Sequence, residues 1–151
     1  MKVLIVEDDR NKLANISGFL RQNIPELILS ESYSYQSGLK NIRKEQFDFL
    51  ILDMSLPNYD INAEESGFKF RHFAGSELLD EMNRYGYIVP TFIVTQFDTF
   101  GEGTSQKTLA EIDNELIIKF PNQYFGIIFY SASEEAWKAK LLDSVLKYCK
   151  S

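Results

Sequence analysis

Acidic residues directly follow two short apolar runs. Asp53 follows Phe49–Leu52, and Glu7 and Asp8 follow Val3–Val6. An apolar run that ends in a carboxylate and a turn predicts a buried strand with an acid at its C-terminal end. If the two strands lie side by side in a parallel sheet, the carboxylates converge at one edge. Because crowded carboxylates repel one another, we expect them to share a cation, and hard oxygen ligands favour Mg²⁺.

Apolar periodicity along the chain predicts the elements that would position these acids. Strands are expected at 3–6, 27–29, 47–52, 90–95 and 125–130. Helices are expected around 13–20, 35–45, 75–82, 109–117 and 133–148, the last capped by Ser133. Five strands that alternate with five helices predict an α/β protein with a parallel sheet covered on both faces. Ligands bind such sheets beyond the C-terminal ends of the strands, where Glu7, Asp8, Asp53 and Thr95 all fall.

Two connections are longer than a strand-to-helix turn requires. They run from 58 to 74 and from 96 to 107, and both leave the edge where the acids are expected. In the first, Phe68–Phe73 alternates aromatic with basic residues, which favours an amphipathic ribbon packed on the domain or, alternatively, a lid over the site. A nucleic-acid platform would need more positive charge around it. His72 is the single histidine, so a soft-metal site is not indicated.

Composition limits the class of protein. A chain of 151 residues has the size of one domain, and 44% hydrophobic content is ample for a core. The net charge of −6 argues against non-specific binding to nucleic acid or anionic membranes. The single cysteine, Cys149, cannot form an internal disulfide and fits a reducing compartment. Because we also see no secretory leader and no membrane-spanning run, we expect a cytoplasmic protein.

At these residues the chain resembles the receiver domain of two-component response regulators. The matching stretches are Val6-Glu7-Asp8-Asp9, Asp53-Met54-Ser55-Leu56-Pro57 and Thr95. The resemblance spans essentially residues 1–151. It implies a single receiver-like domain with extended loops near 58–74 and 96–107. The implied fold is flavodoxin-like, a doubly wound (βα)5 arrangement around a five-stranded parallel sheet.

The resemblance also implies roles for individual residues. In receivers, an aspartate after the third strand takes a phosphoryl group from a phosphohistidine, and an acid pair holds Mg²⁺. Asp53 would then be the phosphoacceptor and a metal ligand, and Asp8 a direct metal ligand. Glu7 would bind the metal through water, and the backbone carbonyl of Ser55 would be a further ligand. Thr95 would donate its hydroxyl to a phosphoryl oxygen. A carboxylate suits the acceptor role because it carries no proton at neutral pH and needs no base.

The last predicted strand departs from the family pattern. Receivers end this strand with a lysine followed by proline, and they carry an aromatic residue three positions before the lysine. Here Tyr130 and Ser131 stand at the first two positions, and Ile127 stands at the third. In the family, the lysine and the aromatic residue together carry the conformational change that follows phosphorylation. Both are therefore altered here. The candidates for a replacement cation are Lys119, Lys69 and Arg71.

The leading hypothesis is a response regulator that accepts a phosphoryl group on Asp53 and signals through protein–protein interaction, because the chain ends directly after the last helix. We expect no enzymatic activity beyond self-phosphorylation and autodephosphorylation. The implied partners are a histidine kinase or phosphotransfer protein and an unknown downstream protein, and a homodimer is left open.

Two other classes compete with this hypothesis. Tyr130 and Ile127 favour a pseudo-receiver, an interaction module that works without phosphorylation. A metal-dependent phosphatase or nuclease would need a general acid or base beyond the metal-binding carboxylates, and the sequence shows none.

Overall fold

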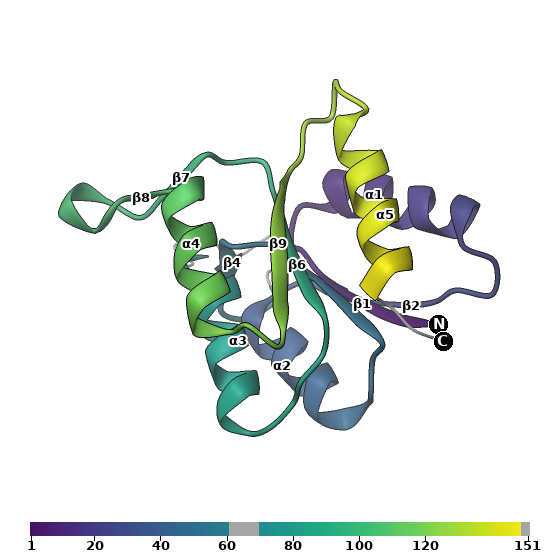
Figure 1. Cartoon of the computed structure of the whole chain (residues 1–151), viewed down its shortest axis with the longest axis horizontal. Coiled ribbons are helices and arrows are strands. Elements are labelled where there is room, and N and C mark those ends of the chain that lie inside the picture. The colour runs from purple at the N-terminus through teal and green to yellow at the C-terminus, as the bar shows by residue number, and fades with distance from the viewer. Residues whose placement is uncertain (61–69, 149–151) are drawn as a thin grey trace.

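The computed structural model describes residues 1–60 and 70–148. Within these residues a five-stranded parallel sheet has the order β2-β1-β3-β6-β9 (Figure 1). Its strands are β1 (Lys2–Val6), β2 (Ile28–Ser32), β3 (Phe49–Leu52), β6 (Thr91–Thr95) and β9 (Tyr124–Phe129). The winding direction reverses between β1 and β3, which defines the switch point of a doubly wound sheet. The predicted flavodoxin-like α/β fold is confirmed.

Helices cover both faces of this sheet. They are α1 (Arg10–Asn23), α2 (Tyr35–Lys44), α3 (Ala74–Arg84), α4 (Leu109–Lys119) and α5 (Ala136–Tyr148). Figure 1 shows α1 and α5 on one face, and α2, α3 and α4 on the other. The prediction that Ser133 caps the last helix is wrong, because a turn in which the Glu134 amide donates to the Ser131 carbonyl comes first and α5 begins only at Ala136. In the described chain, no helix has the length and apolarity to span a bilayer.

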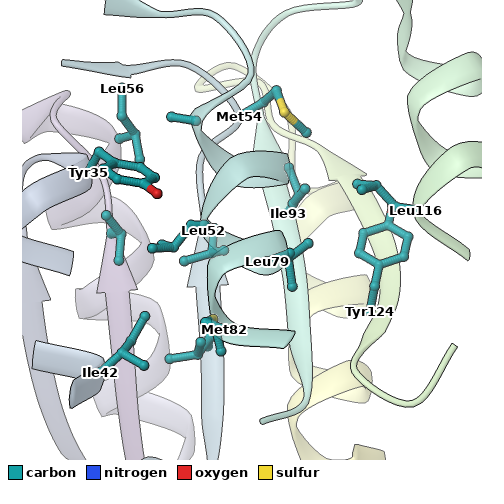
Figure 2. Close-up of a cluster of buried hydrophobic side chains, with 14 of the residues drawn as sticks. Tyr35, Ile42, Leu52, Met54, Leu56, Leu79, Met82, Ile93, Leu116 and Tyr124 are labelled. Atoms are coloured by element: carbon teal, nitrogen blue, oxygen red, sulfur yellow. The ribbon is translucent and has the colours of Figure 1, made fainter. Parts of the chain in front are cut away.

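A separate apolar core fills each face of the sheet. Figure 2 shows the core under α2, α3 and α4, where Leu52, Leu79 and Ile93 meet. The opposite core packs Ile51 against Trp137 and other residues of α1 and α5. The central strands are buried on both faces, which explains their continuous apolar runs. Each large side chain buried here contributes about 1.5–3 kcal/mol, so the ends of β1 and β3 are firmly held.

Strand β9 carries an irregularity near its start. Thr91 pairs with Tyr124 but Phe92 pairs with Gly126, so one extra residue bulges from β9. Gly126 has φ +155°, and a Cβ there would come within 2.7 Å of the Phe92 ring, so glycine is required. Beyond the bulge the pairing is regular up to the end of β6. The residue after β9, Tyr130, then donates its amide to the Thr95 carbonyl at 2.7 Å.

The two long connections form short antiparallel ribbons. In the first, β4 (Leu56–Pro57) pairs with β5 (Phe70–Arg71). In the second, β7 (Thr99–Phe100) pairs with β8 (Lys107–Thr108) around a 3₁₀ turn, η1 (Gly103–Ser105). This second ribbon projects beyond α4 in Figure 1. The part of the predicted Phe68–Phe73 ribbon that begins at Phe70 is present, whereas Phe68, Lys69 and Cys149 lie outside the described residues.

Candidate functional site

Three carboxylates meet where β1 and β3 end. Val6 pairs with Leu52 across the two strands, and the Asp53 amide donates to the Val6 carbonyl at 3.0 Å. This register brings one carboxylate oxygen each from Glu7, Asp8 and Asp53 within 4.8 Å of one another. Glu7 and Asp53 are buried and Asp8 is half-buried. The structure therefore brings together the acids that the sequence predicted would converge.

The Asp53 carboxylate is fixed by its own backbone. Its Oδ1 accepts a hydrogen bond from the Met54 amide at 2.8 Å. The start of α3 packs against this turn, because the Gly75 amide donates to the Met54 carbonyl at 3.0 Å. A Cβ at position 75 would lie only 2.9 Å from the Asp53 carbonyl oxygen, so the close approach requires glycine. The position of Asp53 is thus set by the turn and α3 together.

A lysine that the sequence analysis did not single out lies beneath the acids. Lys12 is 1% exposed, and its Nζ lies 2.5 Å from Glu7 Oε1 and 3.5 Å from Asp53 Oδ2. The same ammonium donates to the Val94 carbonyl at 2.6 Å. A signal was available in the sequence. Lys12 stands four residues before Ile16 and so shares the buried face of α1.

The start of α1 fixes where this lysine lies. The Asp9 side chain caps the helix by accepting from the amides of Asn11 and Lys12, at 3.0 and 3.1 Å. Asp9 is therefore a helix cap, although it also borders the site. The loop that carries Glu7 and Asp8 and the helix that carries Lys12 are held as one unit.

The pKa values of these groups are displaced by burial and by one another. Burial, followed by the charge of Asp53, raises the pKa of Glu7 to about 9, and Lys12 offsets only part of this. Burial and the charge of Asp53 also raise the pKa of Asp8. Burial by itself lowers the pKa of Lys12, but the charges of Asp53 and Glu7 outweigh it and raise that pKa. Three acids with one ammonium leave a deficit of positive charge.

A divalent cation fits this deficit and this set of donors. The carboxylates offer hard oxygen ligands, and the half-exposed Asp8 leaves room for water on the cation, as Mg²⁺ requires. They face an open cavity of about 360 Å³. Its walls are formed by Glu7, Asp8, Asp9, Asp53, Ser55, Phe70, His72, Gln96 and Phe97. Both long connections therefore contribute to the site.

Contacts within the first connection tie it to the acid cluster. The Ser55 hydroxyl donates to the His72 carbonyl at 3.2 Å, directly beside the β4–β5 ribbon. His72 is about half exposed, and its Nε2 lies 3.8 Å from Glu102 Oε1, near the second ribbon. His72 thus lies at the rim of the cavity between the two ribbons, in a place the sequence could not assign.

Thr95 ends β6 at the same edge of the sheet and is fully buried. Its Oγ1 accepts a hydrogen bond from the Phe97 amide at 3.2 Å. The next residues, Gln96 and Phe97, line the cavity, while Thr95 is not among the lining residues. In this state Thr95 organises the start of the second connection.

Of the three candidates for a replacement cation, the two that the structure describes, Arg71 and Lys119, do not lie beside the acids. Arg71 donates to Glu77 at 2.7 Å and to Asn58 at 2.9 Å, and it stacks 3.6 Å from the Tyr35 ring. Lys119 ends α4, and therefore lies at the opposite edge of the sheet from the acids. Lys69 lies outside the described residues. Over 1–60 and 70–148, Lys12 is the basic side chain within ion-pair distance of Asp53.

The residues that depart from the receiver pattern face the two cores. The Tyr130 hydroxyl accepts from Asn15 Nδ2 at 2.7 Å, and its ring centroid lies 5.0 Å from that of Trp137. Lys12 Nζ lies 5.8 Å from the same tyrosine ring. Ile127 pairs with Ile93 and packs against the core of the other face. The tyrosine thus belongs to the α1–α5 core, directly behind the buried lysine.

Comparison with known proteins identifies the family. No family model matches the chain. The Detocs response regulatory protein DtcB of Enterobacter cloacae is 32% identical over 147 residues, which cover 96% of this chain and 98% of that protein. An uncharacterized protein of Sinorhizobium fredii, y4jR, is 33% identical over 147 residues and 97% of each chain.

Solved structures show the same fold. A CheY-like receiver domain protein from Methanospirillum hungatei has a TM-score of 0.62 at 16% identity, covering 97% of this chain and 90% of that one. The response regulator TrrA of Thermotoga maritima, solved with Mg²⁺ and BeF, has a TM-score of 0.62 at 14% identity, covering 95% and 97%. With its relatives, its fold and its acid cluster agreeing, the chain belongs to the response-regulator receiver family.

Proposed function

We propose that this response regulator accepts a phosphoryl group on Asp53 while Mg²⁺ is held by Glu7, Asp8, Asp53 and the Ser55 carbonyl. The observation that carries the proposal is the convergence of three carboxylates on an open cavity at the ends of β1 and β3. The negative charge of the three carboxylates exceeds the positive charge beside them, which supports a cation there. Half-buried Asp8 is the most accessible of the three.

The proposed transfer needs little from the protein beyond position and charge. A carboxylate oxygen of Asp53 forms a bond to phosphorus. The bond between phosphorus and the donor atom breaks, and the leaving group takes the electron pair. The Met54 amide at 2.8 Å fixes the plane of the attacking carboxylate. When bound, Mg²⁺ supplies charge neutralisation of the phosphoryl oxygens. Thr95 would donate its hydroxyl to the phosphoryl group, and its oxygen can still accept from the Phe97 amide.

The proposed partners follow from the family. Receiver domains are signalling proteins that interact with kinases or phosphotransfer proteins and with downstream proteins. The relative named Detocs response regulatory protein supports a signalling role here. We infer a histidine kinase or phosphotransfer protein as phosphodonor, and output through protein contacts in the cytoplasm. The only catalysis inferred is self-phosphorylation and autodephosphorylation.

The second candidate function is an interaction module that works without phosphate. The burial of Tyr130 in the α1–α5 core favours it, because this residue brings no charge to the site. The contact between Lys12 and Asp53 argues against it, because it puts a positive charge next to the proposed acceptor.

Small phosphodonors test the proposal. The protein is incubated with Mg²⁺ and acetyl phosphate or phosphoramidate, and its intact mass is measured. One phosphoryl group should be added and then lost with hydroxylamine, as expected for an acyl phosphate. Asp53→Asn should take up none. Asp9→Asn removes an equal charge beside the site and keeps a good helix cap, so it should behave like the unmodified protein.

Each other outcome has a distinct meaning. A protein that takes up no phosphate under these conditions would favour the phosphate-independent module. Turnover of a phosphoester would favour a hydrolase. Phosphate on a serine or on Asp9 would contradict the assignment of Asp53.

A further inference from the structure

We propose that Lys12 supplies, from α1, the fixed positive charge that holds the phosphoryl group on Asp53. The inference rests on the proposed phosphorylation of Asp53 and names a residue that would bind the phosphoryl group. No other basic group of the described chain is recorded within ion-pair distance of this carboxylate. The residue after β9 is Tyr130, which carries no positive charge. Lys12 would therefore supply from a helix the positive charge that is absent at the end of β9.

The ammonium of Lys12 lies between three strand ends. Its contacts are Glu7 Oε1 at 2.5 Å, the Val94 carbonyl at 2.6 Å and Asp53 Oδ2 at 3.5 Å. An ammonium has three protons to donate, and these oxygens come from the ends of β1, β6 and β3. The contact with Asp53 is the longest of the three. It is the contact with most room to tighten when charge is added on Asp53.

The charge balance of the site gives Lys12 this task. Three carboxylates are balanced by one ammonium and one divalent cation. A phosphoryl group on Asp53 replaces one negative charge by about 1.5 to 2 and adds strong acceptor oxygens. The added charge falls on the side chain that Lys12 already approaches. A buried ammonium is costly unless it is paired, and Glu7 and Asp53 pair with Lys12 at this place beneath the proposed acceptor.

Aromatic side chains pack near the ammonium of Lys12. The ring of Tyr130 lies 5.8 Å from Nζ, and its hydroxyl is held by Asn15, one turn further along the same helix. Trp137 also packs against this ring, with 5.0 Å between the ring centroids. The ammonium of Lys12 therefore has an aromatic ring near it as well as its three oxygen partners. The lysine on α1 and the tyrosine after β9 form one unit.

Lys12→Gln tests the proposal, because glutamine keeps much of the length and removes the charge. Two affinities are measured by calorimetry: that of Mg²⁺ alone, and that of beryllofluoride at saturating Mg²⁺. The affinity for beryllofluoride should fall tenfold or more. The affinity for Mg²⁺ should be unchanged or several-fold higher, since a positive charge next to Glu7 is lost. General damage to the site would instead weaken both.

Two variants serve as controls. Lys12→Arg keeps the charge and should retain more beryllofluoride affinity than Lys12→Gln. Arg21→Gln removes one exposed positive charge from the last turn of the same helix and should change neither affinity. An unchanged beryllofluoride affinity in Lys12→Gln, or a parallel loss of both affinities, would overturn the proposal.

A measurement on the unmodified protein does not depend on whether the variants fold. In a crystal structure with Mg²⁺ and beryllofluoride, Lys12 Nζ should lie within about 3.2 Å of a fluorine, the limit for such a contact. An ammonium that remains on Glu7 and Val94 alone would overturn the proposal. Unmodified protein that binds no beryllofluoride and takes up no phosphate would overturn the proposed function, and this inference with it.

Discussion

The two sides of the site are built differently. At the ends of β1 and β3, the acids lie directly after their strands, and the strand register alone brings them together. At the end of β6, Thr95 contacts the start of a long connection. After the end of β9, the Tyr130 side chain packs in the core between the sheet and helices α1 and α5. Among residues 1–60 and 70–148, the positive charge beside Asp53 comes from α1 instead. The difference teaches that clustered acids at strand ends depend on one strand register, whereas a cation that pairs with them can come from any element that reaches them.

The largest expected effect lies on the acid side. The proposed Mg²⁺ site forms only in the folded protein, so Mg²⁺ should raise the melting temperature, with about 2.7 kcal/mol of added stability at a concentration of 100 times Kd. Asp8→Asn should remove most of this rise, because a direct ligand is lost. Asp9→Asn carries the same change in charge and should keep it. Thermal melts with and without Mg²⁺ check this. An equal rise in Asp8→Asn would show that the acids do not form one metal site.

A smaller effect is expected where β6 ends. Thr95→Ala should slow phosphoryl uptake from acetyl phosphate about tenfold, equivalent to about 1.4 kcal/mol, the scale of one hydrogen bond to a charged group. Thr95→Ser keeps the hydroxyl and should remain close to the unmodified protein. Initial rates are followed by intact mass. If alanine and serine give equal rates, the hydroxyl does not contact the phosphoryl group.

The conformational response should also differ between regions. A ligand shifts an equilibrium only through contacts that differ between the two states. Because Tyr130 and Ile127 are packed in cores, we expect beryllofluoride to alter amide exchange in the two long connections more than around Ile127. The described parts of these connections are residues 58–60, 70–74 and 96–107. Hydrogen exchange with and without the mimic measures this. Changes confined to α4 and β9 would show that an ordinary relay survives.

The smallest effect is expected at Tyr130. Tyr130→Phe removes the hydrogen bond from Asn15 and should lower the free energy of unfolding by about 0.5–1.5 kcal/mol. Beryllofluoride affinity should change little, because the ring behind Lys12 remains. Denaturant melts and calorimetry measure the two quantities. Tyr85→Phe, at an exposed tyrosine, serves as the control for stability. A large loss of beryllofluoride affinity would place the hydroxyl itself in the site.

The sequence by itself determined the elements and the acid cluster. The apolar runs of Val3–Val6 and Phe49–Leu52 are local patterns, and both strands lie where these patterns predict. Once a parallel sheet is inferred, its geometry requires that the residues after these strands share one edge. Glu7, Asp8 and Asp53 could therefore be brought together without knowledge of any contact. The Ser133 cap failed because two turn residues before α5 leave no periodic signal.

Only the tertiary structure decided which basic side chain pairs with the acids. Lys119, Lys69 and Arg71 were candidates by type, but a cation is selected by reach across strands, which sequence spacing does not encode. Lys12 reaches Asp53 because α1 packs over the ends of β1, β3 and β6. Tyr130 points into the core because Asn15 and Trp137 surround it there. These contacts join residues far apart in the chain, and only packing brings them together.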